Sequence, residues 1–183
     1  FICCLTAKTQ EIQVQVSEKS SKYVFDQTQL MDKHFLYGYA ELLLNDASST
    51  YVQVFHEYEL KKKTKLHIEY RSFLLDGEKW RNTYLVGLSL NMIRNNILYI
   101  DFSPLYRFEN KHLWQTTFTY GVSYKNITFD GYFDLYGSKK ADAFSENKLK
   151  IHIDKFILGV NLEYSLYESV DKMTPYVMLG IKL

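Results

Sequence analysis

The sequence contains no run of about 18 consecutive apolar residues, so it holds no candidate for a transmembrane helix. Its 2 cysteines, Cys3 and Cys4, are adjacent near the N-terminus, which argues against a disulfide framework or a zinc site in the rest of the chain. It also lacks an excess of one charge, because 22 Lys and Arg are interspersed with 21 Asp and Glu. The sequence therefore shows no basic stripe of the kind that would indicate a nucleic-acid partner.

Aromatic residues and alternating polarity are abundant instead. The chain of 183 residues has 16 tyrosines and 12 phenylalanines but only 2 prolines and 8 glycines, and large aromatic side chains favour strands over helices. The segment "HLWQTTFTYGVSYKNITFDGYFDLYG" (112–137) shows two alternating runs joined at Lys125 and Asn126. Such a period of two recurs along almost the whole chain, so the sequence predicts an all-β protein in one domain.

About twelve strands are predicted from this alternation. The first two and the tenth are the weakest, and the segment "DQTQLMDKHF" (26–35) has a short helical turn as its alternative. The predicted strands cover residues 11–16, 21–27, 35–45, 50–60, 64–74, 82–93, 96–107, 113–124, 127–137, 148–153, 156–167 and 174–183.

The predicted connections alternate between short and long from residue 60 onward. Short turns at 61–63, 94–95, 125–126 and 154–155 are interleaved with longer polar segments at 75–82, 108–112, 137–147 and 168–173. Outer-membrane barrels have this pattern, with short periplasmic turns and longer surface loops. We expect both termini in the periplasm, which requires an even number of strands, and twelve satisfies that.

The two faces of the predicted strands differ in polarity. One face is apolar, as in Leu66, Ile68 and Tyr70, and the other carries charges even at strand centres. A soluble barrel or sandwich would bury the apolar face, whereas a membrane barrel would turn that face to lipid and enclose the charges. The loop pattern, the N-terminal segment and the tyrosines near strand ends favour a closed antiparallel transmembrane β-barrel. The predicted lumen-lining residues are Glu57, Glu59, Lys65, His67, Glu69, Arg71, Asp101, Arg107, Asp130, Tyr132, Asp134 and Glu163.

The N-terminal "FICCLTAKTQ" is apolar and then small and polar, like the tail of a secretory signal. We expect residues 1–9 to be a signal remnant and residues 10–183 to form the barrel domain of a bacterial outer-membrane protein. The expected partners are outer-membrane lipid, other envelope proteins and small polar solutes.

Seven segments carry a resemblance to a known family. They are "EIQVQV", "YAELLLND", "FHEYEL", "KLHIEYRSFLLDGEKWRNTYLVGLSL", "ITFDGYFDLYG", "GVNLEYSL" and "TPYVMLGIKL". In order and spacing the chain resembles an uncharacterised group of Bacteroidota outer-membrane barrels that is similar to the nucleoside-specific channels. The resemblance implies a twelve-stranded barrel, a periplasmic N-terminus and the passage of small polar solutes such as nucleosides.

The polar face leaves several functions open. Its charges can form an ion-paired filling that stiffens the wall, or a polar track that screens solutes. Asp130, Tyr132, Asp134 and Tyr136 can likewise pack a narrow lumen, or stack and hydrogen-bond a base or sugar. The leading hypothesis is a narrow channel for small polar solutes. The alternatives are a non-conducting accessory subunit of an envelope complex and a soluble ligand-binding barrel.

No enzyme, metal site or cofactor is predicted. The chain has no nucleophile motif such as G-x-S-x-G. Its five histidines are scattered without metal-ligand spacing, and His56 falls on the apolar face. Acid and base partners such as His67 and Glu69 exist, but a catalytic site needs a nucleophile or substrate geometry that the sequence does not indicate.

Overall fold

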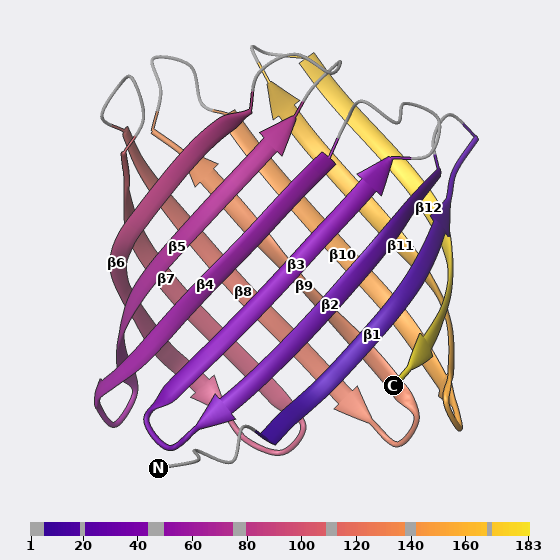
Figure 1. Ribbon diagram of the computed structural model, residues 1–183, viewed down its shortest axis with the longest axis horizontal. Coiled ribbons are helices and arrows are strands. Elements are labelled where there is room, and N and C mark those ends of the chain that lie inside the picture. The colour runs from indigo at the N-terminus through magenta and orange to yellow at the C-terminus, as the bar shows by residue number, and fades with distance from the viewer. Residues whose placement is uncertain are drawn as a thin grey trace.

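The described part of the chain forms twelve antiparallel strands that close into a barrel (Figure 1). The computed structural model describes residues 6–18, 21–43, 50–74, 80–108, 113–137, 142–167 and 170–183. The strands are β1 (Thr6–Val16), β2 (Ser21–Met31), β3 (His34–Leu43), β4 (Thr50–Lys61), β5 (Thr64–Leu74), β6 (Arg81–Arg94), β7 (Leu98–Phe108), β8 (Leu113–Tyr124), β9 (Ile127–Tyr136), β10 (Asp142–Ile153), β11 (Phe156–Tyr167) and β12 (Val170–Lys182). Because β1 pairs with both β2 and β12, every described strand has a partner on each side. The predicted fold is confirmed.

Short turns gather at one end of the barrel, which we call the turn end, and the start of β1 and the end of β12 lie there as well (Figure 1). Two residues join β2 to β3, β4 to β5, β8 to β9 and β10 to β11, and three join β6 to β7. Each two-residue turn contains one residue with positive φ, which lets the chain reverse within a short span. These residues are Asp32 (46°), Lys63 (73°), Lys125 (54°) and Asp154 (55°). The four short turns predicted from the sequence all coincide with connections at this end.

Four strands, β1, β2, β10 and β12, extend at least four residues beyond their predicted bounds. Residues 28–31 continue β2, because Thr28 to Met31 pair with Tyr37 to His34 of β3, so the helical-turn alternative for 26–35 is wrong. Residues 142–147 belong to β10 and not to a long loop 137–147, and Glu146 pairs with both Tyr132 and Glu163. Neither 28–31 nor 142–147 carries apolar residues at every second position, so the alternation that predicts a strand is absent from these segments. The start of β12 at Val170 likewise shortens the predicted loop 168–173.

The N-terminal strand begins before the predicted domain boundary. β1 includes residues 6–9, which the sequence assigned to a signal remnant. Whether residues 1–9 are such a remnant stays a prediction. No helix among the described residues is long and apolar enough to cross a membrane.

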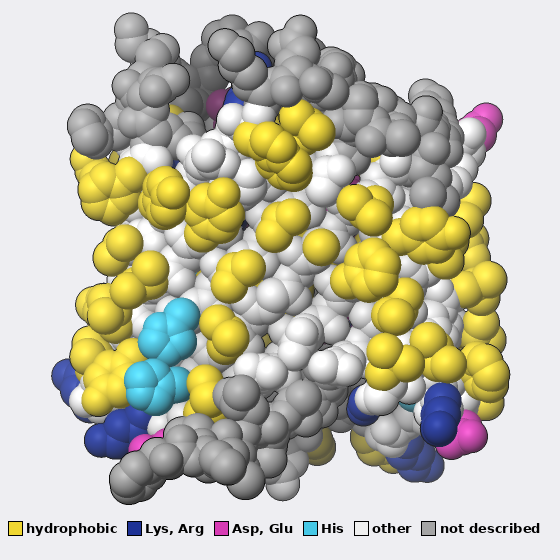
Figure 2. Space-filling model, in the orientation of Figure 1, with side chains coloured by type: hydrophobic (Ala, Val, Ile, Leu, Met, Phe, Trp, Pro, Cys, Tyr) yellow, Lys and Arg dark blue, Asp and Glu magenta, His cyan; other side chains and the backbone are white. Residues whose placement is uncertain are grey.

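Large apolar side chains cover the outside of the barrel, as Figure 2 shows for one face. Val86, Leu88, Leu158 and Val160 are each 37–51% exposed, whereas the buried side chains of the interior include Lys22, at 1% exposure. In a soluble barrel this distribution would be reversed, because water solvates charges and disfavours a continuous apolar surface. The arrangement is that of a membrane barrel, with an apolar outer band and a polar interior.

Close packing on the outer wall depends on a glycine at residue 131. The Tyr120 side chain reaches across Gly131 and its hydroxyl donates a hydrogen bond to the Asn147 side-chain oxygen. A Cβ at residue 131 would lie 2.4 Å from the backbone oxygen of Glu146 and 3.2 Å from the Tyr120 hydroxyl. The absence of a side chain therefore lets an aromatic residue cover the wall and satisfy a polar group that faces lipid.

Candidate functional site

The barrel lumen contains two cavities arranged in series between the turn end and the opposite end. The cavity nearer the turn end, which we call the lower chamber, has a volume of about 590 Å³ and reaches the turn-end residues Lys65 and Asn95. The other cavity, which we call the upper chamber, has a volume of about 400 Å³ and reaches Phe73 and Leu113 toward the opposite end. The lining residues that both chambers share are Arg71, Tyr132 and Glu146. These residues define the partition between the chambers.

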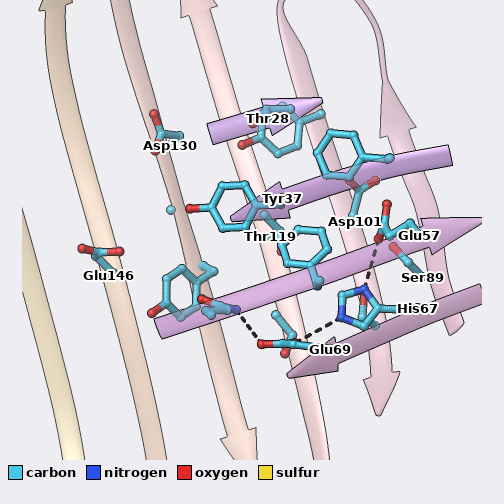
Figure 3. A pocket seen from close by; sticks show the side chains of 18 of the residues that line it. Thr28, Tyr37, Glu57, His67, Glu69, Ser89, Asp101, Thr119, Asp130 and Glu146 are labelled. Atoms are coloured by element: carbon cyan, nitrogen blue, oxygen red, sulfur yellow. Dashed lines mark hydrogen bonds and ion pairs between the residues drawn. The ribbon is translucent and has the colours of Figure 1, made fainter. Parts of the chain in front are cut away.

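One wall of the lower chamber carries a continuous row of hydrogen-bonded charges from β4 and β5 (Figure 3). Lys65 Nζ lies 2.5 Å from Glu57 Oε2, and His67 Nδ1 lies 3.3 Å from Glu57 Oε1. On its other side His67 Nε2 lies 3.1 Å from Glu69 Oε2. Because carboxylates only accept hydrogen bonds, both contacts of His67 are satisfied when both ring nitrogens carry hydrogen. This row forms because residues two apart on one strand share a face.

Arg71 continues that row and crosses the lumen. Its Nε contacts Glu69 on the same strand, and its Nη1 lies 3.2 Å from Asp134 Oδ2 on β9. β5 and β9 are separated by three strands in the barrel wall, so this ion pair spans the interior. Lys148 of β10 also reaches across, with its Nζ 5.4 Å from the centre of the Tyr39 ring on β3. The partition is therefore built from side chains of opposite walls.

Two other lysines each hold a pair of carboxylates. Lys22 Nζ lies 3.1 Å from Glu41 and also contacts Glu163. Lys150 Nζ lies 3.2 Å from Glu11 and 3.6 Å from Asp130. Arg71 has the same arrangement with Glu69 and Asp134. We call these three groups carboxylate–cation–carboxylate triads, and each has one more acidic than basic member.

The structure places the sequence-predicted lumen residues as follows. Those that line the lower chamber are Glu57, Lys65, His67, Glu69, Arg71, Asp101, Asp130 and Tyr132. Those that line the upper chamber are Arg71, Arg107, Tyr132, Asp134 and Glu163. Of the predicted lumen residues, all of which the structure describes, Glu59 alone lines neither chamber. It is exposed near the turn end of β4.

Several lumen residues were not among the predicted ones. Glu11, Asp26 and Glu146 lie on β1, β2 and β10, the three strands whose alternation was weakest. The predicted strand 21–27 already contains Asp26, which the period of two places on the same face as Lys22. Tyr37 and Phe55 were missed because β3 and β4 carry aromatic or apolar residues on both faces.

An outward-facing histidine pair interrupts the apolar surface near the turn end. His34 of β3 and His56 of β4 are stacked with ring centres 5.1 Å apart, and His34 Nδ1 lies 2.9 Å from His56 Nε2. Figure 2 shows two adjacent histidines low on the visible face. This contact satisfies one ring nitrogen of each histidine. No group of three or more His, Cys, Asp or Glu suited to a metal ion occurs in the described ranges.

Comparison with known proteins identifies the fold. No family model and no curated protein matches the chain. Among solved structures, the NanC porin is similar with a TM-score of 0.66 and 10% identity, covering 95% of this chain and 98% of that chain. The KdgM porin is similar with a TM-score of 0.65 and 12% identity, covering 96% and 99%.

The chain is thus an outer-membrane-type β-barrel with the porin fold. At such identities the similarity establishes the fold alone. Membership of the Bacteroidota group, and the relation to nucleoside channels, stay predictions.

Proposed function

We propose that the protein is a channel of the bacterial outer membrane for small polar solutes. The observation that carries the proposal is the pair of chambers in series along a polar lumen, inside a barrel whose outer surface is apolar. A cavity of this size and lining suits a small solute, because ligand sites commonly enclose about 300–1,000 Å³. The porin fold of the similar structures supports the same function.

The upper chamber supports nucleoside-like or sugar-like solutes. Its lining places Tyr39, Tyr51, Tyr132 and Tyr136 beside carboxylates such as Asp134. Aromatic faces stack on bases or sugar rings, and carboxylates accept hydrogen bonds from hydroxyl and amino groups. One similar structure is a KdgM porin in complex with disordered oligogalacturonate. A nucleoside or neutral sugar fits the acidic and aromatic lining of this chain better than that polyanion does.

Planar-bilayer recording of the purified protein tests the channel. We expect discrete conductance steps in potassium chloride and, in proteoliposomes, faster swelling in nucleoside or monosaccharide solutions than in empty liposomes. A silent bilayer with no solute-dependent swelling would reject the channel.

The non-conducting accessory subunit is the second candidate. The observation that favours it is the Arg71–Asp134 contact across the lumen, which narrows the passage between the chambers. Copurification of an envelope partner in mild detergent, together with silence of both the natural protein and a variant without Arg71, would support this alternative.

We also propose that the turn end and both termini face the periplasm, as short turns do in outer-membrane barrels. In a chain whose Cys3 and Cys4 are replaced by serine, a membrane-impermeant maleimide should label Trp80→Cys on intact cells. Lys62→Cys, in the β4–β5 turn, should react only after the outer membrane is opened. The reverse pattern would invert the proposed orientation.

A further inference from the structure

Acidic side chains outnumber basic ones along the whole lumen. Seven carboxylates and five Lys or Arg side chains line the lower chamber, and five carboxylates and two Arg side chains line the upper one. Glu146 and Arg71 belong to both, so the described lining holds eleven carboxylates and six Lys or Arg side chains. The buried Lys22 and a doubly protonated His67 bring the cations to eight, so an acidic excess remains. The entire chain nevertheless has a net charge of +1. Negative charge is therefore concentrated inside the barrel and positive charge outside it.

The triads explain why ion pairing does not cancel this excess. In the Lys22 and Lys150 triads one cation is shared by two carboxylates, so a negative charge remains after pairing. In the Arg71 triad Glu69 has His67 as a second partner. Much of the remaining positive charge of the chain lies on exposed turns instead. These turn residues include Lys33, Lys62, Lys63, Lys125 and Lys155.

Two carboxylates of the lower chamber are less fully paired than those of the triads. Among the described residues Asp26 has no ion-pair partner within 4.0 Å, and its one hydrogen bond comes from the Tyr37 hydroxyl at 3.4 Å. Asp101 pairs through Oδ2 with Arg94, whose side chain is 51% exposed, while its buried Oδ1 has no hydrogen-bond partner in the described part of the chain. Asp26 lies on β2 and Asp101 on β7, with four strands between them along the shorter way round the barrel. A cation in the lower chamber would therefore meet carboxylates on more than one side.

From this charge arrangement we infer that the lumen selects for cations, and that its permeant solutes carry a positive charge or none. The inference rests on the proposed channel function. Rings and tracks of Asp and Glu concentrate cations in a pore, since low-dielectric walls focus the field of fixed charges into the lumen. Anionic solutes are repelled by the same field.

The reversal potential in a bilayer that separates two concentrations of potassium chloride tests the selectivity. We expect a reversal potential whose sign shows that K⁺ is more permeant than Cl⁻. Its magnitude should be larger at low salt, because the fixed charges are screened less there. Asp26→Asn and Asp101→Asn should each shift the reversal potential toward zero, and the double variant should shift it further. Asp154→Asn is the matched control, because it removes a carboxylate from an exposed turn, and asparagine tolerates the φ of 55° found there. It should leave the reversal potential unchanged.

A reversal potential of anion-selective sign would overturn the inference and leave the channel standing. So would a cation-selective value that neither aspartate variant changes. Complete absence of conductance would instead reject the proposed channel, and selectivity with it. Heat-modifiable gel mobility verifies that each variant is folded, and liposome swelling in lysine against glutamate solutions gives an independent readout, with lysine expected to enter faster.

Discussion

The Arg71 side chain is 13% exposed and holds carboxylates from opposite walls of the barrel. Its guanidinium offers several donors in a rigid fork, which suits it to two carboxylates at once. Removing it would open the partition and leave Glu69 and Asp134 without their strongest partner. A single residue thus influences both the width of the passage and the stability of the wall.

Arg71→Ala should raise single-channel conductance and lower the free energy of unfolding. Loss of one partner of a buried ion pair costs about 3–5 kcal/mol, and partial hydration of the lumen reduces that cost. The matched control is Arg94→Ala, which breaks the half-exposed pair with Asp101 and should cost below about 1 kcal/mol. Bilayer recording and urea unfolding in detergent measure the two effects. Equal conductance in Arg71→Ala and the natural protein would show that the partition does not limit flow.

Gly131 and Gly38 provide a second comparison at the residue scale. A Cβ at Gly131 would meet the backbone oxygen of Glu146 at 2.4 Å, whereas a Cβ at Gly38 would meet nothing within 4 Å. Gly131→Ala should therefore lower the unfolding free energy by about 1–3 kcal/mol through overpacking. Gly38→Ala should be neutral or stabilise by up to about 1 kcal/mol, because it restricts the unfolded chain. Matching urea midpoints for the two variants would contradict this account.

At the scale of elements, the β1–β12 seam has the fewest backbone partners. Its described register contains six residue pairs, from Glu11↔Lys182 to Val16↔Val177, against twelve between β11 and β12. Side chains reinforce it, since Lys22 contacts Glu163 and Lys150 contacts Glu11 across the seam. Asn161 of β11 also donates a hydrogen bond to Gln15 of β1 over 2.9 Å. Polar contacts in the lumen thus help to close the barrel.

Lys22→Met should weaken the closed barrel more than Lys65→Met. Lys22 joins β2 and β11 and is 1% exposed, whereas Lys65 pairs with Glu57 on the neighbouring strand, and Glu57 keeps His67 as a partner. Hydrogen exchange in detergent should show faster exchange of β1 and β12 amides in Lys22→Met, and unchanged exchange there in Lys65→Met. Equal protection of the seam in both variants would show that side-chain bridging contributes nothing to closure.

The alternating pattern in the sequence predicts some strand boundaries correctly and misses others. The alternation located eight strands to within two residues at each end, but it began β1 near residue 11 and β12 near residue 174, ended β2 near residue 27 and began β10 near residue 148. Outward positions on the missed parts carry polar residues such as Gln29 and Asn147. Their strand conformation is imposed by hydrogen bonding to β3 and to β9 and β11, not by a local pattern.

At the scale of the whole molecule, polarity is reversed relative to a soluble protein. Leu88, near the middle of β6, is 40% exposed, and Leu60, near the turn end of β4, is 54% exposed. In water these two positions would respond alike to a charged substitution. In a bilayer they differ in depth, so their responses separate the two environments.

Leu88→Arg should lower the unfolding free energy measured in lipid vesicles by about 2–4 kcal/mol, because the charge lies near the bilayer midplane. Leu60→Arg should cost only about 0–1 kcal/mol, since an arginine near the interface reaches the headgroups. If both variants were neutral, the outer surface would not face lipid.

The sequence by itself determined the number of strands, the end at which the chain makes its short turns and the wall face of most charged residues. It could do so because a period of two assigns alternate side chains to opposite faces. Only the tertiary structure decided that Arg71 meets Asp134, that three cations are each shared by two carboxylates and that the lumen divides into two chambers. Those contacts join strands that are distant in the sheet, and their alignment follows from the stagger and closure of the barrel, which local alternation does not encode.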